Sequence, residues 1–193
     1  MHTHPPDPDI LAHCVALVVA NNQPDTEALM RLAHKLRFGD IAAWSPTLGH
    51  APFSHRLVFF LVHFDFGDAD RLALLKNLRH SGSVSLCYAP VVMFLRDASE
   101  EQVRACVEMG FDEVINVPAE GKGMATRLAG QIGREHLYVE TRNYLGPDRH
   151  RLDHRADKPA QRQAEEPHAR LIIRRTVEEG VHIVRREGVP KGH

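Results

Sequence analysis

Short apolar runs alternate with amphipathic segments along the first two thirds of the chain. Five runs are apolar at nearly every position, which is typical of strands buried on both faces of a parallel sheet. These runs are 14–20, 41–44, 56–64, 91–95 and 114–117. Apolar residues recur at helical spacing in the intervening segments, which are 24–38, 72–78, 99–110 and 122–134. Strands that alternate with single helices predict a parallel sheet with helices on both faces.

The segment Pro90–Pro118 contains a complete strand–helix–strand unit. Ser99 followed by Gln102 predicts a capping box at the start of its helix. Gly110 supplies the left-handed residue that ends the helix, and Pro118 stops the second strand. Between the second and third strands, by contrast, the two prolines and one glycine of residues 45–56 predict a very short helix or none.

Five strands and about five helices in some 125 residues predict a flavodoxin-like doubly wound domain, whose ligand crevice lies at the carboxyl ends of the strands. Over residues 14–136 the order and spacing of three segments resemble the CheY-like receiver domain of bacterial response regulators. The three segments are VVANNQPDTEALMRLAHKLRFG, RLVFFLVHFDFGDADRLALLKNLR and APVVMFLRDASEEQVRACVEMGFDEVINVPAE. The resemblance implies a two-component (phosphorelay) signalling protein with a receiver-like domain at residues 13–136.

The positions that carry receiver chemistry differ in this chain. A working receiver uses an acidic pair to hold magnesium, an aspartate to accept phosphate, a Ser or Thr, and a lysine. The matching positions are Asn21 and Asn22, His63, Leu95 and Val117. Two amides offer magnesium less negative charge, and neither Leu95 nor Val117 can offset charge on a transferring phosphoryl group. We therefore expect a degenerate receiver that binds no magnesium or other cofactor and is not an enzyme.

Two alternatives remain at these positions. Asp65 becomes the phosphoacceptor if the third strand ends two residues later, although this register restores neither the acidic pair nor the lysine. Otherwise His63 is a polar residue at the end of a strand, and Asn21 and Asn22 are expected to hydrogen-bond each other.

A protein partner is expected on the face formed by helix 99–110, strand 114–117 and helix 122–134, together with the start of the tail. In a signalling pathway this partner is a histidine kinase, a phosphotransferase or a downstream effector. Mixed charges on such a face specify a partner and its orientation more than they add affinity. The exposed groups expected there are Glu101, Arg104, Glu108, Lys122, Arg127 and Arg142.

Residues 137–168 are predicted to form a largely irregular extension and linker. Residues 144–151 resemble the Tyr-Phe-Gly-Pro-Asp-Arg-Arg-Arg extension of some stand-alone receivers, with departures at Leu145 and His150. The resemblance implies cyclic-di-GMP as a possible ligand, because aromatic and guanidinium groups suit guanine and phosphate. The residues concerned are Arg142, Tyr144, Arg149 and Arg151. In the alternative, Tyr138 and Tyr144 lay the extension across its own domain.

Two β-branched runs around Glu178-Glu179-Gly180 predict a β-hairpin at residues 169–188. Its arginines leave nucleic-acid binding as a further alternative. The sequence shows no helix-turn-helix pattern, however, and nearby glutamates lower the positive charge of the hairpin. Nucleic-acid binding is therefore disfavoured. The Pro- and His-rich residues 1–12 are expected to be a disordered leader.

Composition agrees with one domain plus an extension. The 193 residues are 43% hydrophobic and 25% charged. No apolar run approaches the roughly 20 residues that cross a bilayer, and the amino terminus does not resemble a signal peptide, so no membrane contact and a cytoplasmic location are expected. Charge is uneven: 12 basic against 16 acidic residues up to residue 136, then 12 against 9.

Cysteine and histidine residues do not predict a metal site. Cys14, Cys87 and Cys106 lie in or beside apolar segments without CxxC spacing, so we expect small core residues. The histidines of the leader lack an acid or thiol at ligand spacing.

Overall fold

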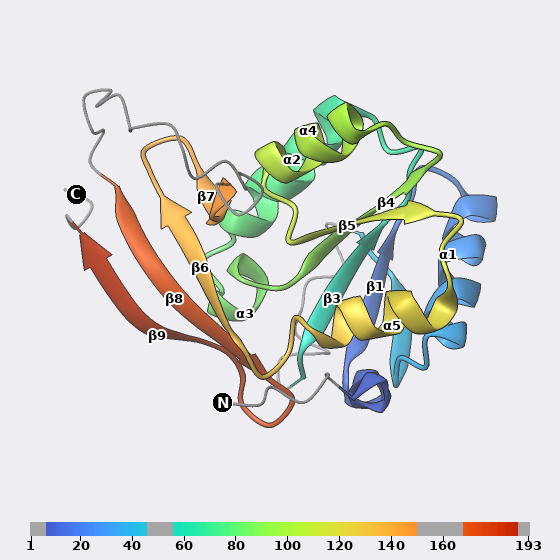
Figure 1. Ribbon diagram of the computed structural model, residues 1–193, viewed down its shortest axis with the longest axis horizontal. Coiled ribbons are helices and arrows are strands. Elements are labelled where there is room, and N and C mark those ends of the chain that lie inside the picture. The colour runs from blue at the N-terminus through green and yellow to red at the C-terminus, as the bar shows by residue number, and fades with distance from the viewer. Residues whose placement is uncertain (1–6, 46–55, 150–167, 189–193) are drawn as a thin grey trace.

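The computed structural model describes residues 7–45, 56–149 and 168–188. These residues form two sheets (Figure 1). One is a five-stranded parallel sheet with strand order β2-β1-β3-β4-β5, and the other is a four-stranded antiparallel sheet with order β7-β6-β8-β9.

The parallel sheet confirms the five predicted strands. Every residue of β1 and β3 is buried, as expected for strands covered on both faces. The strand order is that of a flavodoxin-like doubly wound fold. The strands are β1 (Val15–Val19), β2 (Asp40–Ala43), β3 (Val58–Val62), β4 (Val91–Arg96) and β5 (Glu113–Val117).

Helices cover both faces of this sheet. Helices α1 and α5 pack on one face, and α2 and α4 on the other (Figure 1). The capping box of α4 is present as predicted, and Gly110 ends that helix in the left-handed conformation. Any helix between β2 and β3 falls in residues 46–55, outside the described residues. The helices are α1 (Gln23–Lys35), α2 (Asp68–Arg79), α3 (Val84–Cys87), α4 (Glu100–Met109) and α5 (Gly121–Ala129).

The apolar stripe of α2 differs from the prediction. Leu72 is 53% exposed, whereas Leu74, Leu75 and Leu78 are buried. The helix begins at Asp68, and its orientation is set by packing against β1, β3 and β4. Leu72 is thereby left at the surface, beside a groove described below.

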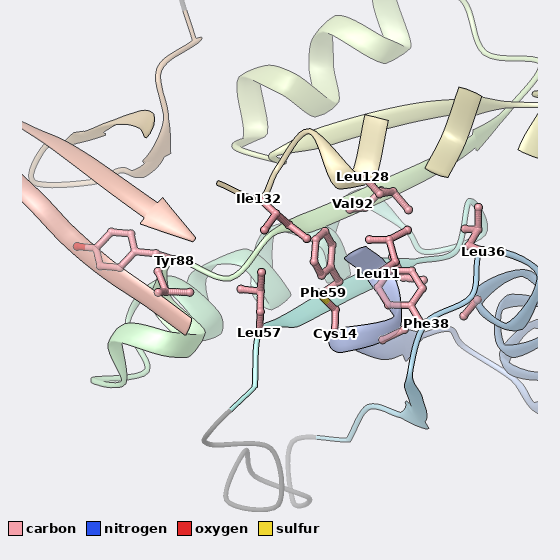
Figure 2. Packing of buried hydrophobic residues seen from close by; sticks show 14 of the residues in the cluster. Leu11, Cys14, Leu36, Phe38, Leu57, Phe59, Tyr88, Val92, Leu128 and Ile132 are labelled. Atoms are coloured by element: carbon pink, nitrogen blue, oxygen red, sulfur yellow. The ribbon is translucent and has the colours of Figure 1, made fainter. Parts of the chain in front are cut away.

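The predicted disordered leader, residues 1–12, is corrected in part. Residues Pro8–His13 form a 3-10 helix, η1, whose first turn is capped when Asp7 accepts a hydrogen bond from the Asp9 backbone N–H at 3.0 Å. Leu11 is fully buried in the core on the α1 and α5 face (Figure 2). Burial of Leu11, with Ile10 packed beside the same core, stabilises the ordered segment.

The core on that face is built around Phe59 of β3. Its ring meets Phe38 edge-to-face with 5.4 Å between centroids. Figure 2 shows Leu128 and Ile132 reaching the same region from α5 and the loop that follows it. The three cysteines are free and buried, so their prediction as core residues is confirmed.

The second sheet corrects the prediction of an irregular extension at 137–168. Strands β6 (Glu135–Glu140) and β7 (Leu145–Pro147) pair antiparallel, and β6 also pairs with β8 (Ala169–Thr176). The predicted hairpin is confirmed, because β8 pairs antiparallel with β9 (Gly180–Gly188). The proposed boundary at residue 136 thus falls inside a strand. Residues 150–167 lie outside the described residues.

Alternate residues of β8 face the parallel-sheet domain. Ala169, Leu171, Ile173 and Arg175 are buried, and the first three join the core of the α1 and α5 face. From β6, Tyr138 stacks edge-to-face on Tyr88, with 5.4 Å between ring centroids. The two sheets therefore share one core rather than forming separate domains. Among the described residues, no helix is long and apolar enough to cross a membrane.

Candidate functional site

The structure places the predicted site residues Asn21, Asn22 and His63 just after the carboxyl ends of β1 and β3. The His63 backbone N–H continues the sheet by donating to the Val19 carbonyl at 2.9 Å. This is the crevice edge at which doubly wound folds bind ligands.

The two asparagines bond to different partners, so the expected mutual hydrogen bond is wrong. The Asn22 Oδ1 caps α1 by accepting from the Asp25 backbone N–H at 3.0 Å, and the Asn22 amide donates to Asp25 Oδ2 at 2.7 Å. The Asn21 amide donates to the Asp65 backbone carbonyl at 3.0 Å. Asn22 therefore holds a carboxylate, and Asn21 holds the loop after β3.

His63 lies between two carboxylates. Its side chain is 7% exposed, and its Nδ1 is 3.4 Å from Asp25 Oδ2 and 4.0 Å from Asp65 Oδ2. The Asp65 backbone N–H also approaches Nδ1, at 3.4 Å. One atom from each of the three side chains lies within 4.8 Å of the other two. The alternative phosphoacceptor Asp65 is thus a direct neighbour of His63.

Leu95 and Val117, the other two positions matched to receiver chemistry, lie in apolar or cationic surroundings. Leu95 is buried in β4 and lines a small crevice of about 210 Å³ with Phe64, Arg71 and Arg96. The guanidinium of Arg96 lies 3.9 Å from the centre of the Phe64 ring. Arg71 donates to the Phe64 carbonyl at 2.9 Å and pairs with Asp68. Val117 ends β5 and is half-buried.

The predicted partner face is only partly assembled. Glu101, Arg104 and Glu108 are exposed on α4, and Lys122 is exposed on α5, which covers the opposite face of the parallel sheet. Both helices flank the edge strand β5, but the residues do not gather into one cavity.

Arg127 serves a structural role that the sequence did not predict. Its guanidinium pairs with Glu113 and donates to the Val114 carbonyl at 2.7 Å. These bonds hold α5 against β5, so Arg127 is a poor candidate for partner binding.

A groove of about 680 Å³ lies between α2, α4 and residues 142–149 of the tail. It brings Glu108 of the predicted partner face together with Arg142, Tyr144 and Arg149 of the predicted nucleotide site, whereas Arg151 lies outside the described residues. The other residues that line the groove are Leu72, Leu75, Lys76, Arg79, His80, Ala105, Met109, Asn143 and Leu145.

Tyr144 anchors the tail beside this groove. Its hydroxyl donates to the Pro147 carbonyl at 2.7 Å, and the Arg149 guanidinium lies 3.5 Å from the centre of its ring. A Cβ built on Gly110 would lie 3.1 Å from the Tyr144 ring, so glycine allows the tail to approach α4. Burial raises the pKa of Tyr144. These contacts favour the alternative in which the tail packs on its own domain.

The best-connected polar cluster was missed in the sequence. Asp112, just before β5, accepts from Arg79 at 2.7 Å and from Arg175 at 2.6 Å. Tyr138 also donates its hydroxyl to Asp112. Arg175 completes the cluster by donating to Gln131 at 2.7 Å. We call these five residues the buried arginine network.

Each member of the buried arginine network is at most 8% exposed. Burial opposes ionisation of Asp112, but Arg175, Arg79 and the hydrogen bond from Tyr138 hold its pKa well below the usual range. Burial raises the pKa of Tyr138, so its hydroxyl stays protonated and can donate. One signal was available in the sequence: Arg175 follows Leu171 and Ile173 on the inward phase of a predicted strand.

The amino acid sequence matches no model of a known protein family, and no curated protein matches it. Resemblance to receivers therefore rests on the three quoted segments and on the strand order.

Proposed function

We propose that this chain is a receiver-like module of a two-component signalling pathway that has lost the phosphorylation chemistry and acts by binding a protein partner. The observation that carries the proposal is a pair of amide side chains at the carboxyl edge of a sheet with flavodoxin-like strand order. Asn21 and Asn22 occupy that edge where a receiver needs an acidic pair, and both side chains are engaged in local hydrogen bonds.

Phosphorylation chemistry lacks its usual helpers at this edge. Asp65 is exposed. Leu95, however, is a buried apolar side chain without a hydroxyl, and Val117 offers no positive charge. Phosphoryl transfer depends on positioned positive charge, and the nearby Arg71 is held by Asp68 and a backbone carbonyl. Asp65 is therefore a weak phosphoacceptor.

Intact-mass measurement after incubation with magnesium and acetyl phosphate tests this loss. We expect no added phosphoryl group on the full chain. An Asp65→Asn variant treated in parallel is the matched control. Substantial modification of the wild type that disappears in this variant would show a working phosphoacceptor and overturn the proposal.

Partner binding is proposed on the exposed side of α4 and the adjoining start of the tail. Arg104 is exposed on α4, and Arg142 lines the groove with Glu108. Asn116 fixes the loop before α4 through two hydrogen bonds with the Ala98 backbone, at 2.9 and 3.0 Å. A loop held this way favours one arrangement of the face instead of a phosphate-driven switch.

Capture from native cytoplasm followed by charge reversal tests this surface. Arg104→Glu and Arg142→Glu should each reduce recovery of the specific partner, a kinase, phosphotransferase or effector, whereas His63→Gln should not. The reverse pattern would place the working surface at the strand ends. The full chain is needed, because removing the tail would also remove Tyr138 and Arg175 from the buried arginine network.

Binding of cyclic-di-GMP is the second candidate, favoured by the groove. There Arg142, Arg149 and Lys76 lie around an apolar floor. Arg79 also lines the groove, but its charge is paired with Asp112. Calorimetry with the dinucleotide should give heat that is lost in Arg142→Glu and retained in Lys122→Glu. Absence of heat from the wild type would eliminate this candidate.

Nucleic-acid binding through the hairpin is less well supported. Arg175 is buried, Arg186 pairs with Glu140 at 2.6 Å, and Arg185 pairs with Glu187 at 3.0 Å. These pairs lower the positive potential that phosphate binding requires.

A further inference from the structure

Three side chains converge at the carboxyl edge, where the His63 Nδ1 accepts only a long hydrogen bond, from the Asp65 backbone N–H at 3.4 Å, which an ion at Nδ1 would replace. They are Asp25 in the first turn of α1, His63 directly after β3, and Asp65 in the turn that follows. One oxygen from each carboxylate and the His63 Nδ1 lie within 4.8 Å of one another. The sequence predicted no metal site, because Asp25 belongs to a different element and no ligand spacing is visible.

The separations fit ligands around a single small ion. Metal–ligand bonds of about 2.0–2.2 Å place neighbouring ligand atoms roughly 3–3.5 Å apart in tetrahedral or octahedral arrangements. The His63–Asp25 separation is already 3.4 Å, and the His63–Asp65 separation is 4.0 Å. The Asp65 side chain is 58% exposed, so a shorter separation from His63 would displace water rather than packed side chains.

Hydrogen bonds from the two asparagines hold these residues in place. The Asn22 amide donates to Asp25 Oδ2 at 2.7 Å, which orients that carboxylate. Asn21 donates to the Asp65 carbonyl at 3.0 Å and so fixes the turn that carries Asp65. His63 is held by its backbone bond to β1 and is nine-tenths buried. Outer hydrogen bonds of this kind are typical around metal ligands.

We propose that Asp25, His63 and Asp65 form a binding site for a divalent first-row transition-metal ion, with Zn²⁺ as its best fit. One imidazole nitrogen and two carboxylate oxygens suit such an ion, whereas magnesium prefers oxygen ligands in octahedral geometry. These ligands differ from the acidic pair and aspartate that hold magnesium in a working receiver. The ion would join α1 to the loop after β3, and this inference stands whether or not the proposed function is right.

Cobalt is a suitable probe, because Co²⁺ bound by protein ligands absorbs visible light. Titration of the metal-free full chain should saturate at one equivalent, and a tenfold excess of Mg²⁺ should not displace the ion. Asp65→Asn and His63→Gln should each weaken Co²⁺ binding at least about 100-fold. Asn22→Ser, which keeps the helix cap but removes the amide, should weaken it about tenfold, since losing an outer hydrogen bond typically costs 10–100-fold.

His34→Gln is the matched control, because His34 is exposed on α1 and outside the cluster. It should bind Co²⁺ like the wild type and so separate this site from surface histidines. Asp65 is exposed, so its variant remains informative even if His63→Gln destabilises the fold. Wild-type affinity in Asp65→Asn, or displacement of Co²⁺ by Mg²⁺, would overturn the proposal.

Discussion

The two ends of the parallel sheet use polar side chains in opposite ways. At the carboxyl ends, Asn21 and Asp65 are exposed, and the Asn21 amide donates to the Asp65 backbone carbonyl in the loop after β3. At the amino ends of β4 and β5, Asp112 and Arg175 are almost fully buried and bind one another. A ligand can reach the first cluster, while the second is closed by the antiparallel sheet.

This difference separates binding from stability. Exposed polar contacts contribute little to stability because water competes for them. A buried charge that loses its partner costs several kcal/mol, because water cannot replace that partner. Substitutions at the amino ends should therefore destabilise the fold, whereas substitutions at the carboxyl ends should mainly change what the chain binds.

The largest effect is expected from Asp112→Asn. The substitution keeps the shape but leaves Arg79 and Arg175 buried without a counter-charge. Removing one partner of a buried ion pair typically costs about 3–5 kcal/mol of unfolding free energy. Urea unfolding followed by circular dichroism measures this loss.

Asp70→Asn is the matched control, because Asp70 is exposed in the first turn of α2. Its substitution should change stability by at most about 0.5 kcal/mol. If the two substitutions lowered the unfolding free energy equally, the buried arginine network would contribute no more to stability than a surface residue.

A smaller effect is expected from acid. The folded-state pKa of Asp112 lies well below the roughly 3.9 of an unfolded aspartate. As pH falls below about 4, the unfolded chain gains a proton that the folded chain does not, so stability is lost. Urea midpoints measured at pH 6 and pH 3 should fall further for the wild type than for Asp112→Asn. A parallel decline in both proteins would show that Asp112 is not charged in the folded state.

The smallest effect is expected when aspartate is restored at both Asn21 and Asn22. Without metal, the new carboxylate at position 22 would face Asp25 in place of a 2.7 Å hydrogen bond. Repulsion should outweigh the favourable helix dipole and cost roughly 1 kcal/mol. Thermal melting in the presence of a chelator checks this, with the exposed Asn143→Asp as control. An unchanged or higher melting temperature would show that the hydrogen bond from Asn22 to Asp25 does not stabilise the fold.

The parallel sheet was predictable because its determinants are local. Each buried strand reads as one apolar run, and the capping box at Ser99 and Gln102 marks its helix directly. The predicted hairpin also formed, because a short turn pairs β8 with β9 directly, although the register shifts between Ile172 and Ile173. Pattern and turn residues suffice when partners lie close in sequence.

The second sheet and both clusters depend on distant partners. Strand β6 forms because β8 pairs with it, and the sequence of residues 135–140 alone does not identify that partner. The cluster of Asp25, His63 and Asp65 needs α1 and β3 to be placed first. Leu72 was misassigned because tertiary packing, rather than helical periodicity, chose the buried side of α2.

The long reach of Arg175 bears on the order of events during synthesis. It binds Asp112, 63 residues earlier, and the carbonyl of Tyr88, 87 residues earlier. A chain made from its amino terminus completes all five parallel strands before this arginine leaves the ribosome. A nascent chain that stops growing between β6 and β8 would hold Asp112 without its second cation, and a surface meant for Leu171 and Ile173 would remain uncovered. The hairpin thus closes the molecule last, and translation past residue 175 sets the earliest moment at which the finished core can exist.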